Sequence, residues 1–130
     1  MVQDTKQQKK ILIVEDEDGL RDIIASELEK EGIAVLHAKD GQEGLELAFQ
    51  EQPDLILLDV LMPNVDGLTM LEKLRQNRWG KNAKVIILTN AENDVEKVAK
   101  ALNNDVFEYL VKSRWSLDAV IDRVKEKLDL

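Results

Sequence analysis

The chain has 130 residues, of which 44% are hydrophobic and 34% are charged, and its formal net charge is −8. This composition indicates one folded globular domain and excludes a disordered chain, while the absence of cysteine excludes disulfides and thiolate metal sites. The negative charge argues against a general nucleic-acid-binding or anionic-membrane-binding surface, because both need a basic patch.

The first nine residues are polar and lack the apolar core of a secretory signal. No apolar stretch elsewhere approaches the roughly 20 residues that a membrane-spanning helix needs. We therefore expect a cytoplasmic protein in which a polar arm, residues 1–9, precedes a single domain over residues 10–130.

Five short apolar runs recur along the chain. They lie at residues 11–14, 33–36, 55–58, 85–88 and, interrupted by one glutamate, 106–111. Their apolar character is continuous rather than alternating, which is typical of strands that are buried on both faces of a parallel sheet.

Segments with helical spacing of apolar residues lie between and after these runs. The apolar stripes consist of Leu20, Ile23, Ile24 and Leu28; Leu68, Leu71 and Leu74; Val95, Val98, Ala99 and Leu102; and Leu117, Val120, Ile121, Val124 and Leu128. Asp40 followed by Glu43 predicts a capped helix start, and Gly32 predicts a helix end. The alternation of strand and helix predicts an α/β fold in which helices cover a five-stranded parallel sheet.

Polar residues follow four of the five apolar runs. They are Glu15 and Asp16, Asp59, Thr89, and Lys112. Because the carboxyl ends of parallel strands lie along one edge of a sheet, we expect these side chains to meet there. Open α/β sheets bind their ligands at this edge.

Three carboxylates at one edge need a compensating charge. Two of them about 4 Å apart repel by roughly 4 kcal/mol at an effective dielectric constant near 20, so that one would hold a proton. A divalent cation removes this conflict, and oxygen ligands favour Mg²⁺. Asp59 can then stay ionised and attack phosphorus, while Lys112 and Thr89 contact the phosphoryl oxygens. We therefore predict that Asp59 accepts a phosphoryl group.

Each of these residues also has a purely structural interpretation. Asp16 or Asp18 can cap the first helix, and Asp59 can be a turn residue. Thr89 can be the last residue of a strand, and Lys112 can be a solvated loop charge. The functional interpretation is favoured because four separate strand ends carry chemically complementary groups.

Four segments together resemble the receiver domains of two-component response regulators, the CheY-like family. They are ILIVEDED at 11–18, LILLDVLMPNVDG at 55–67, VIILTN at 85–90 and YLVK at 109–112. The resemblance spans nearly the whole chain and implies a doubly wound, flavodoxin-like sheet with strand order 2-1-3-4-5. It also implies a Mg²⁺-dependent signalling switch with weak self-phosphatase activity rather than a dedicated enzyme.

The resemblance also implies roles for individual residues and for partners. Asp59 resembles the phosphoryl acceptor, and Tyr109 resembles the switch aromatic, for which plain core packing is the alternative. The metal ligands implied are Glu15, Asp16, Asp59 and the backbone carbonyl of Leu61. Thr89 resembles the switch hydroxyl and Lys112 the phosphate-binding lysine. The implied donor is a sensor histidine kinase or a phosphotransfer protein. A downstream protein would bind the fourth helix, fifth strand and fifth helix of a monomer or weak phosphorylation-dependent dimer.

Three residues depart from the family pattern. Ser113 replaces the usual proline after the lysine, so we expect a trans Lys112–Ser113 peptide bond. Asn90 replaces a small residue and can narrow access to Asp59, and Asp105 replaces a glycine in a turn that we expect to persist. Asn90 and Ser113 motivate one alternative function, an interaction module that does not cycle phosphate. A separate alternative is a metal-dependent phosphatase of small molecules.

Overall fold

The computed structural model of the protein describes residues 8–60, 67–90 and 108–130. These residues contain a five-stranded, all-parallel sheet with the strand order β2-β1-β3-β4-β5, which confirms the predicted fold. The strands are β1 (Lys10–Val14), β2 (Ala34–Ala38), β3 (Leu55–Leu58), β4 (Val85–Thr89) and β5 (Glu108–Val111). The helices are α1 (Asp18–Lys30), α2 (Gly41–Glu51), α3 (Gly67–Gln76) and α5 (Leu117–Lys127), with short 3-10 helices η1 (Gly80–Asn82) and η3 (Lys112–Arg114).

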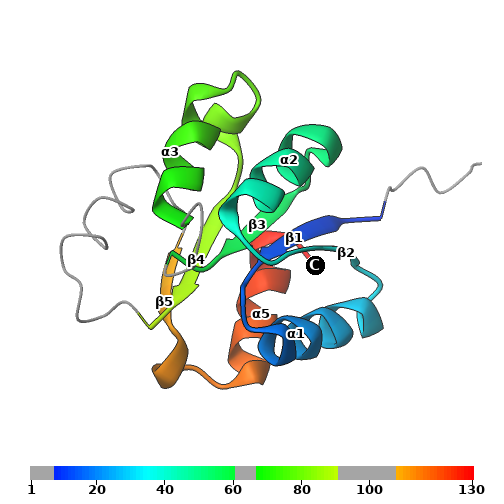
Figure 1. Ribbon diagram of the computed structural model, residues 1–130. Coiled ribbons are helices and arrows are strands. Elements are labelled where there is room, and N and C mark those ends of the chain that lie inside the picture. Colours follow the sequence, from blue (N-terminus) through cyan, green and yellow to red (C-terminus); the bar gives the residue numbers. More distant parts are fainter. Residues whose placement is uncertain (1–7, 61–66, 91–107) are drawn as a thin grey trace, which may run out of the picture.

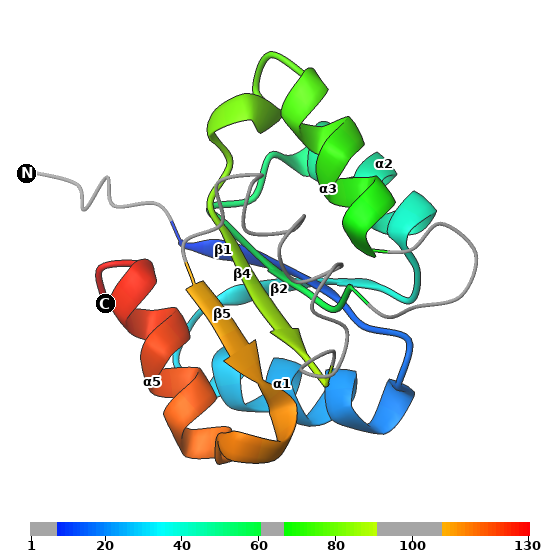
Figure 2. The same cartoon turned by 90° about the vertical axis from the view of Figure 1, so that its left-hand side faces the viewer.

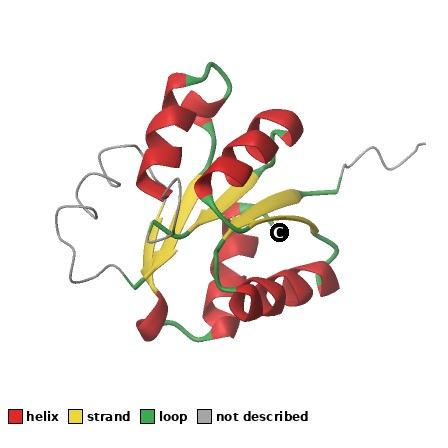
Figure 3. Ribbon diagram, viewed as in Figure 1, coloured by secondary structure: helices red, strands yellow, loops and turns green. Residues whose placement is uncertain are grey.

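The sheet lies between two helical layers. Helices α2 and α3 cover one face and α1 and α5 the other (Figures 1 and 2), so that the strands form the central layer in Figure 3. Successive side chains of a strand point to opposite faces of the sheet, so they are buried in two different hydrophobic cores. In β1, Leu12 and Val14 join the core under α2 and α3, whereas Ile11 and Ile13 join the core under α1 and α5. Burial on both faces explains why the strands are continuously apolar in sequence.

The end of α1 determines where β2 begins. Gly32 has a φ of +82°, and its N–H donates to the Glu29 carbonyl at 3.0 Å, while the Ile33 N–H donates to Leu28 at 3.2 Å. This is the Schellman arrangement that a glycine after a helix favours. Because Ile33 belongs to this turn, β2 starts at Ala34, and the predicted strand bounds of 33–36 were wrong at both ends.

Side chains cap two of the other helices. The Asp40 carboxylate accepts a hydrogen bond from the Glu43 N–H at 2.9 Å, as predicted, and the Glu43 carboxylate reaches back to the Lys39 N–H at 3.3 Å. The Ser116 hydroxyl accepts from the Ala119 N–H at the start of α5. Each cap satisfies a helical N–H that has no carbonyl partner within its helix.

The predicted apolar stripes are mostly buried. One exception is Ile23 on α1, whose side chain is 52% exposed although Ile24 and Leu28 are buried. The stripe predicted at residues 95–102, the turn at 103–105 and the start of the fifth apolar run at 106–107 lie outside the described residues. Within the described ranges, every helix is too short or too polar to cross a bilayer.

Candidate functional site

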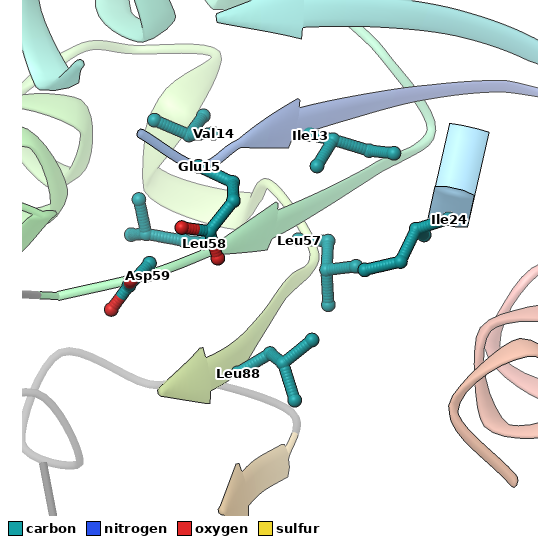
Figure 4. A pocket seen from close by; sticks show the side chains of 8 residues that line it. All are labelled: Ile13, Val14, Glu15, Ile24, Leu57, Leu58, Asp59 and Leu88. Atoms are coloured by element: carbon teal, nitrogen blue, oxygen red, sulfur yellow. The ribbon is translucent and has the colours of Figure 1, made fainter. Parts of the chain in front are cut away.

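Two acidic side chains project from the carboxyl ends of adjacent central strands. Glu15 directly follows β1 and Asp59 directly follows β3 (Figure 4). The sheet's backbone ladder continues into both residues, because the Glu15 N–H donates to the Ala38 carbonyl and the Asp59 N–H donates to the Val14 carbonyl, each at 3.0 Å. The positions of both residues are therefore set by the sheet rather than by loops.

Asp16 completes a cluster of three carboxylates. One oxygen from each of Glu15, Asp16 and Asp59 lies within 4.8 Å of the others. Glu15 and Asp59 are buried, being only 3% and 4% exposed, whereas Asp16 is exposed. Hard oxygen ligands this close together, with one side open to solvent, fit a Mg²⁺ ion that keeps some of its water.

Lys112 connects two members of this cluster. Its Nζ lies 2.7 Å from Glu15 Oε1 and 2.9 Å from Asp59 Oδ2, and its side chain is 13% exposed. Burial lowers the pKa of Lys112, but hydrogen bonds and charges from Glu15 and Asp59 outweigh it and leave the pKa above its ordinary value. Lys112 is therefore a charged, partly buried partner of the acids and not a solvated loop residue.

The environment of Glu15 disfavours its negative charge. Burial, followed by the charge of Asp59, raises the pKa of Glu15 from 4.5 to about 7, although Lys112 and the Glu17 N–H both lower it. Apolar side chains, including Ile13, Leu57 and Leu88, line the space beside the two carboxylates (Figure 4). A single ammonium therefore does not fully stabilise the paired acids, and a further cation at this site would do so.

Thr89 and Tyr109 come from the next two strands. Thr89 is the last residue of β4 and is completely buried, and its Oγ1 has no hydrogen-bond partner among the described residues. Tyr109 pairs with Ile87 in the register of β4 and β5, while Thr89 pairs with Val111. The Tyr109 ring packs on the core under α2 and α3. A buried hydroxyl without a partner is costly, and an incoming anionic ligand would satisfy it.

The structural interpretations of the first acids are not supported. The residue that precedes α1 is Glu17, which makes no side-chain cap, and Asp18 lies in the first turn, where it pairs with Arg21. Among the family departures, the Lys112–Ser113 bond is trans, as expected, and Asn90 is exposed. Leu61 and Asp105 lie outside the described residues.

Two residues beside the site were not predicted from the sequence. Arg21 Nη1 donates to the backbone carbonyl of Glu15 at 2.7 Å. Gly67 lies so close to the backbone after β3 that a Cβ atom there would be 2.1 Å from the Asp59 carbonyl oxygen. For Arg21, the only signal in the sequence was its i,i+3 spacing from Asp18, and oppositely charged residues at this spacing are common on exposed helices.

Comparisons with known proteins agree with this geometry. Residues 11–125 match the model of the response regulator receiver domain. The response regulator ArlR of Staphylococcus saprophyticus subsp. saprophyticus is 39% identical over 119 residues, which are 92% of this chain and 52% of that protein. The chain spans about half the length of the curated relatives it matches.

Two solved structures show the same similarity. A CheY-like receiver domain protein from Methanospirillum hungatei has a TM-score of 0.85 and 32% identity, with 95% of each chain covered. The response regulator TrrA from Thermotoga maritima, solved in complex with Mg²⁺-BeF, has a TM-score of 0.78 and 32% identity. That match covers 92% of this chain and 99% of TrrA.

Proposed function

This chain belongs to the family of response regulator receiver domains, and on that premise we propose that Asp59 accepts a phosphoryl group in a Mg²⁺-dependent reaction. Such domains are signalling switches rather than classic enzymes. The observation that carries the proposal is the Glu15–Lys112–Asp59 arrangement, in which one partly buried ammonium contacts two buried carboxylates beside a third acid.

The donor is a phosphohistidine of a sensor histidine kinase or of a phosphotransfer protein. An Asp59 carboxylate oxygen attacks phosphorus, the new P–O bond forms as the P–N bond breaks, and the electron pair of that bond stays on the imidazole nitrogen. The Lys112 ammonium lies 2.9 Å from Asp59 Oδ2 and places positive charge beside the attacking carboxylate.

Glu15, Asp16, Asp59 and the Leu61 carbonyl would hold Mg²⁺. When bound, the ion supplies positive charge opposite the phosphoryl oxygens. The TrrA complex with Mg²⁺-BeF supports this assignment, because that protein has a similar fold and a similar sequence. Lys112 and Thr89 are the groups of this chain that we assign to the remaining oxygens, Lys112 through its charge and Thr89 through its hydroxyl, which has no partner in the part of the chain that the structure describes.

The same contacts provide a switch. A phosphoryl group adds about 1.5 to 2 negative charges and strong hydrogen-bond acceptors, which draw the Thr89 hydroxyl toward Asp59. Space left by Thr89 admits the ring of Tyr109, two residues before the Thr89 partner on the adjacent strand. A downstream protein then recognises the changed surface of β5, α5 and the fourth helix. The segment predicted to form the fourth helix lies outside the described residues.

Three further assignments complete the proposal. We assign weak self-phosphatase activity to Asp59 and its surroundings, because water can attack the same phosphorus atom. We place the protein in the cytoplasm, as a monomer or a weak phosphorylation-dependent dimer. The folded domain of residues 10–130 would bind its partners directly, without contacting nucleic acid.

Intact-mass measurement after incubation with a small phosphoryl donor and Mg²⁺ tests the central assignment. We expect wild type to gain the mass of one phosphoryl group, Asp59→Asn to gain none, and the exposed Asp122→Asn control to behave as wild type. Chelation of Mg²⁺ should abolish the gain. Equal modification of Asp59→Asn would refute Asp59 as acceptor. A folded, unmodified wild type would instead favour an interaction module that does not cycle phosphate.

A further inference from the structure

The loop between β1 and α1, together with the first residue of α1, contains four consecutive acidic residues. Glu15, Asp16, Glu17 and Asp18 bring four formal negative charges into one short segment, and two of them belong to the proposed metal site. Like charges at this spacing repel, so the loop needs contacts that hold it in one conformation. Lys112 holds the Glu15 side chain, but it does not contact the Glu15 backbone at any bond described.

Arg21 on α1 makes the contact that Lys112 lacks. Its Nη1 donates to the Glu15 backbone carbonyl at 2.7 Å, and its Nη2 pairs with Asp18 at 2.6 Å. The backbone N–H of Arg21 donates to the Glu17 carbonyl at 3.0 Å. The Arg21 side chain therefore ties the Glu15 end of the acidic loop to the first turn of α1, whereas the bond to Glu17 is the ordinary backbone bond of the helix start.

The Glu15 carbonyl has a particular place in the site. It belongs to the peptide group that joins Glu15 to Asp16, and a peptide group is planar. The Asp16 Cα lies in the same plane. A hydrogen bond that holds the Glu15 carbonyl therefore also restricts the position from which the Asp16 side chain extends. Asp16 itself is exposed, so packing does little to orient it.

Arg21 is held there at an energetic cost. Its side chain is only 13% exposed, and its Nε is buried without a hydrogen-bond partner among the described residues. A surface ion pair alone would not require burial of the guanidinium. The two forked N–H contacts to a carbonyl and a carboxylate use geometry that lysine cannot reproduce.

We propose that Arg21 is a positioning residue for the metal site, which orients the Glu15–Asp16 peptide so that both carboxylates converge with Asp59 on Mg²⁺. This inference rests on the proposed function. It concerns a residue that touches neither the phosphoryl group nor the ion. Outer contacts of this kind typically change metal affinity by 10- to 100-fold.

Electrostatics and positioning predict opposite outcomes for Arg21→Ala. Removing a positive charge beside the site should tighten binding of a cation if charge were the only effect. If Arg21 acts by orienting the loop, the same change should weaken Mg²⁺ binding about tenfold. Phosphorylation should then fall at low Mg²⁺ and recover when Mg²⁺ is saturating.

The experiment is a Mg²⁺ titration of the intact chain by calorimetry, with intact-mass phosphorylation at low and saturating Mg²⁺. Lys30→Ala is the matched control, because it removes one positive charge and one i,i+3 ion pair, to Glu27, from the other end of α1. We expect it to bind Mg²⁺ as wild type does. The amide resonance of Asp16 in the metal-free protein should shift in Arg21→Ala and not in the control.

Two conservative variants keep the test informative if Arg21→Ala does not fold. Arg21→Gln keeps an N–H donor without the charge, and Arg21→Lys keeps the charge with a different donor geometry. Positioning predicts intermediate Mg²⁺ affinity for both. Unchanged or tighter binding in a folded Arg21→Ala or Arg21→Gln would overturn the inference while leaving the proposed function intact. A wild type that binds no Mg²⁺ would overturn the proposed function and this inference with it.

Discussion

Gly67, the first residue of α3, is packed directly on the backbone of Asp59 and Val60, just after β3. A Cβ atom there would be 2.1 Å from the Asp59 carbonyl oxygen and 2.5 Å from the Val60 Cα. Both obstructing atoms belong to the backbone, so a rotamer change cannot relieve the overlap. The absence of a side chain at Gly67 therefore allows α3 to lie beside Asp59.

Replacing Gly67 with alanine should force α3 and the Asp59 backbone apart. We expect a loss of about 1–3 kcal/mol in the free energy of unfolding, as is typical of overpacking, together with slower phosphorylation of Asp59. Urea denaturation and intact mass measure the two effects.

Gly19 on α1 provides the matched control, because a Cβ atom there would have no neighbour within 4 Å. Gly19→Ala should be neutral or up to about 1 kcal/mol stabilising, since alanine favours helix. Equal stability of the two variants would show that the contact at Gly67 is not restrictive.

At the scale of elements, the connection from α3 to β4 is held by one arginine. Arg75 Nη1 donates to the carbonyls of Gly80 and Ala83, each at 2.7 Å. The Asn77 side chain accepts hydrogen bonds from the N–H groups of Trp79 and Gly80. The connection is therefore a defined structure that leads into β4, whose last residue is Thr89.

Arg75→Ala should remove the hydrogen bonds from Arg75 to the Gly80 and Ala83 carbonyls, although the Gly80 carbonyl keeps the Ala83 N–H at 3.3 Å, and should destabilise the protein by about 1–3 kcal/mol. Amide hydrogen exchange should accelerate over residues 77–83. Lys73→Ala is the control, because Lys73 is an exposed cation in the last turn of the same helix. Exchange rates unchanged from wild type in Arg75→Ala would contradict a holding role for Arg75.

The elements differ in how far the sequence determined them. The continuous apolar runs predicted five strands and their parallel arrangement, because strands buried on both faces admit few polar residues. The bounds of β2 were wrong because the Schellman turn includes Ile33 and because exposed His37 is still part of the strand. The Arg21 and Arg75 contacts were not predicted, since each joins a side chain to a backbone carbonyl whose direction depends on a loop.

For the whole molecule, the site makes stability depend on pH. The pKa of Glu15 is about 7 in the folded protein, against 4.5 for an ordinary glutamate. A raised folded-state pKa stabilises the native state below the unfolded value, and this stabilisation is lost as the pH rises through the folded value. Ionisation of Glu15 therefore lowers the free energy of unfolding of the metal-free protein as the pH rises from about 4.5 to about 7.

Between about pH 4.5 and about pH 8, the free energy of unfolding of the metal-free wild type should fall by up to about 3 kcal/mol as Glu15 loses its proton. Glu15→Gln cannot ionise at this position, so its unfolding free energy should change less over the same range. Urea denaturation in chelator at several pH values measures both slopes. Parallel pH profiles for the two proteins would count against the assignment to Glu15.

The ammonium of Lys112 has a consequence for how the site receives its substrate. A lysine carries three N–H donors, and the contacts described to Glu15 and Asp59 engage two of them. The third N–H can therefore donate a hydrogen bond to an oxygen of an incoming ligand while the ammonium keeps its contacts with both carboxylates. Under the proposed function, positive charge therefore lies beside Asp59 before a phosphoryl donor binds, and little reorganisation is needed during transfer.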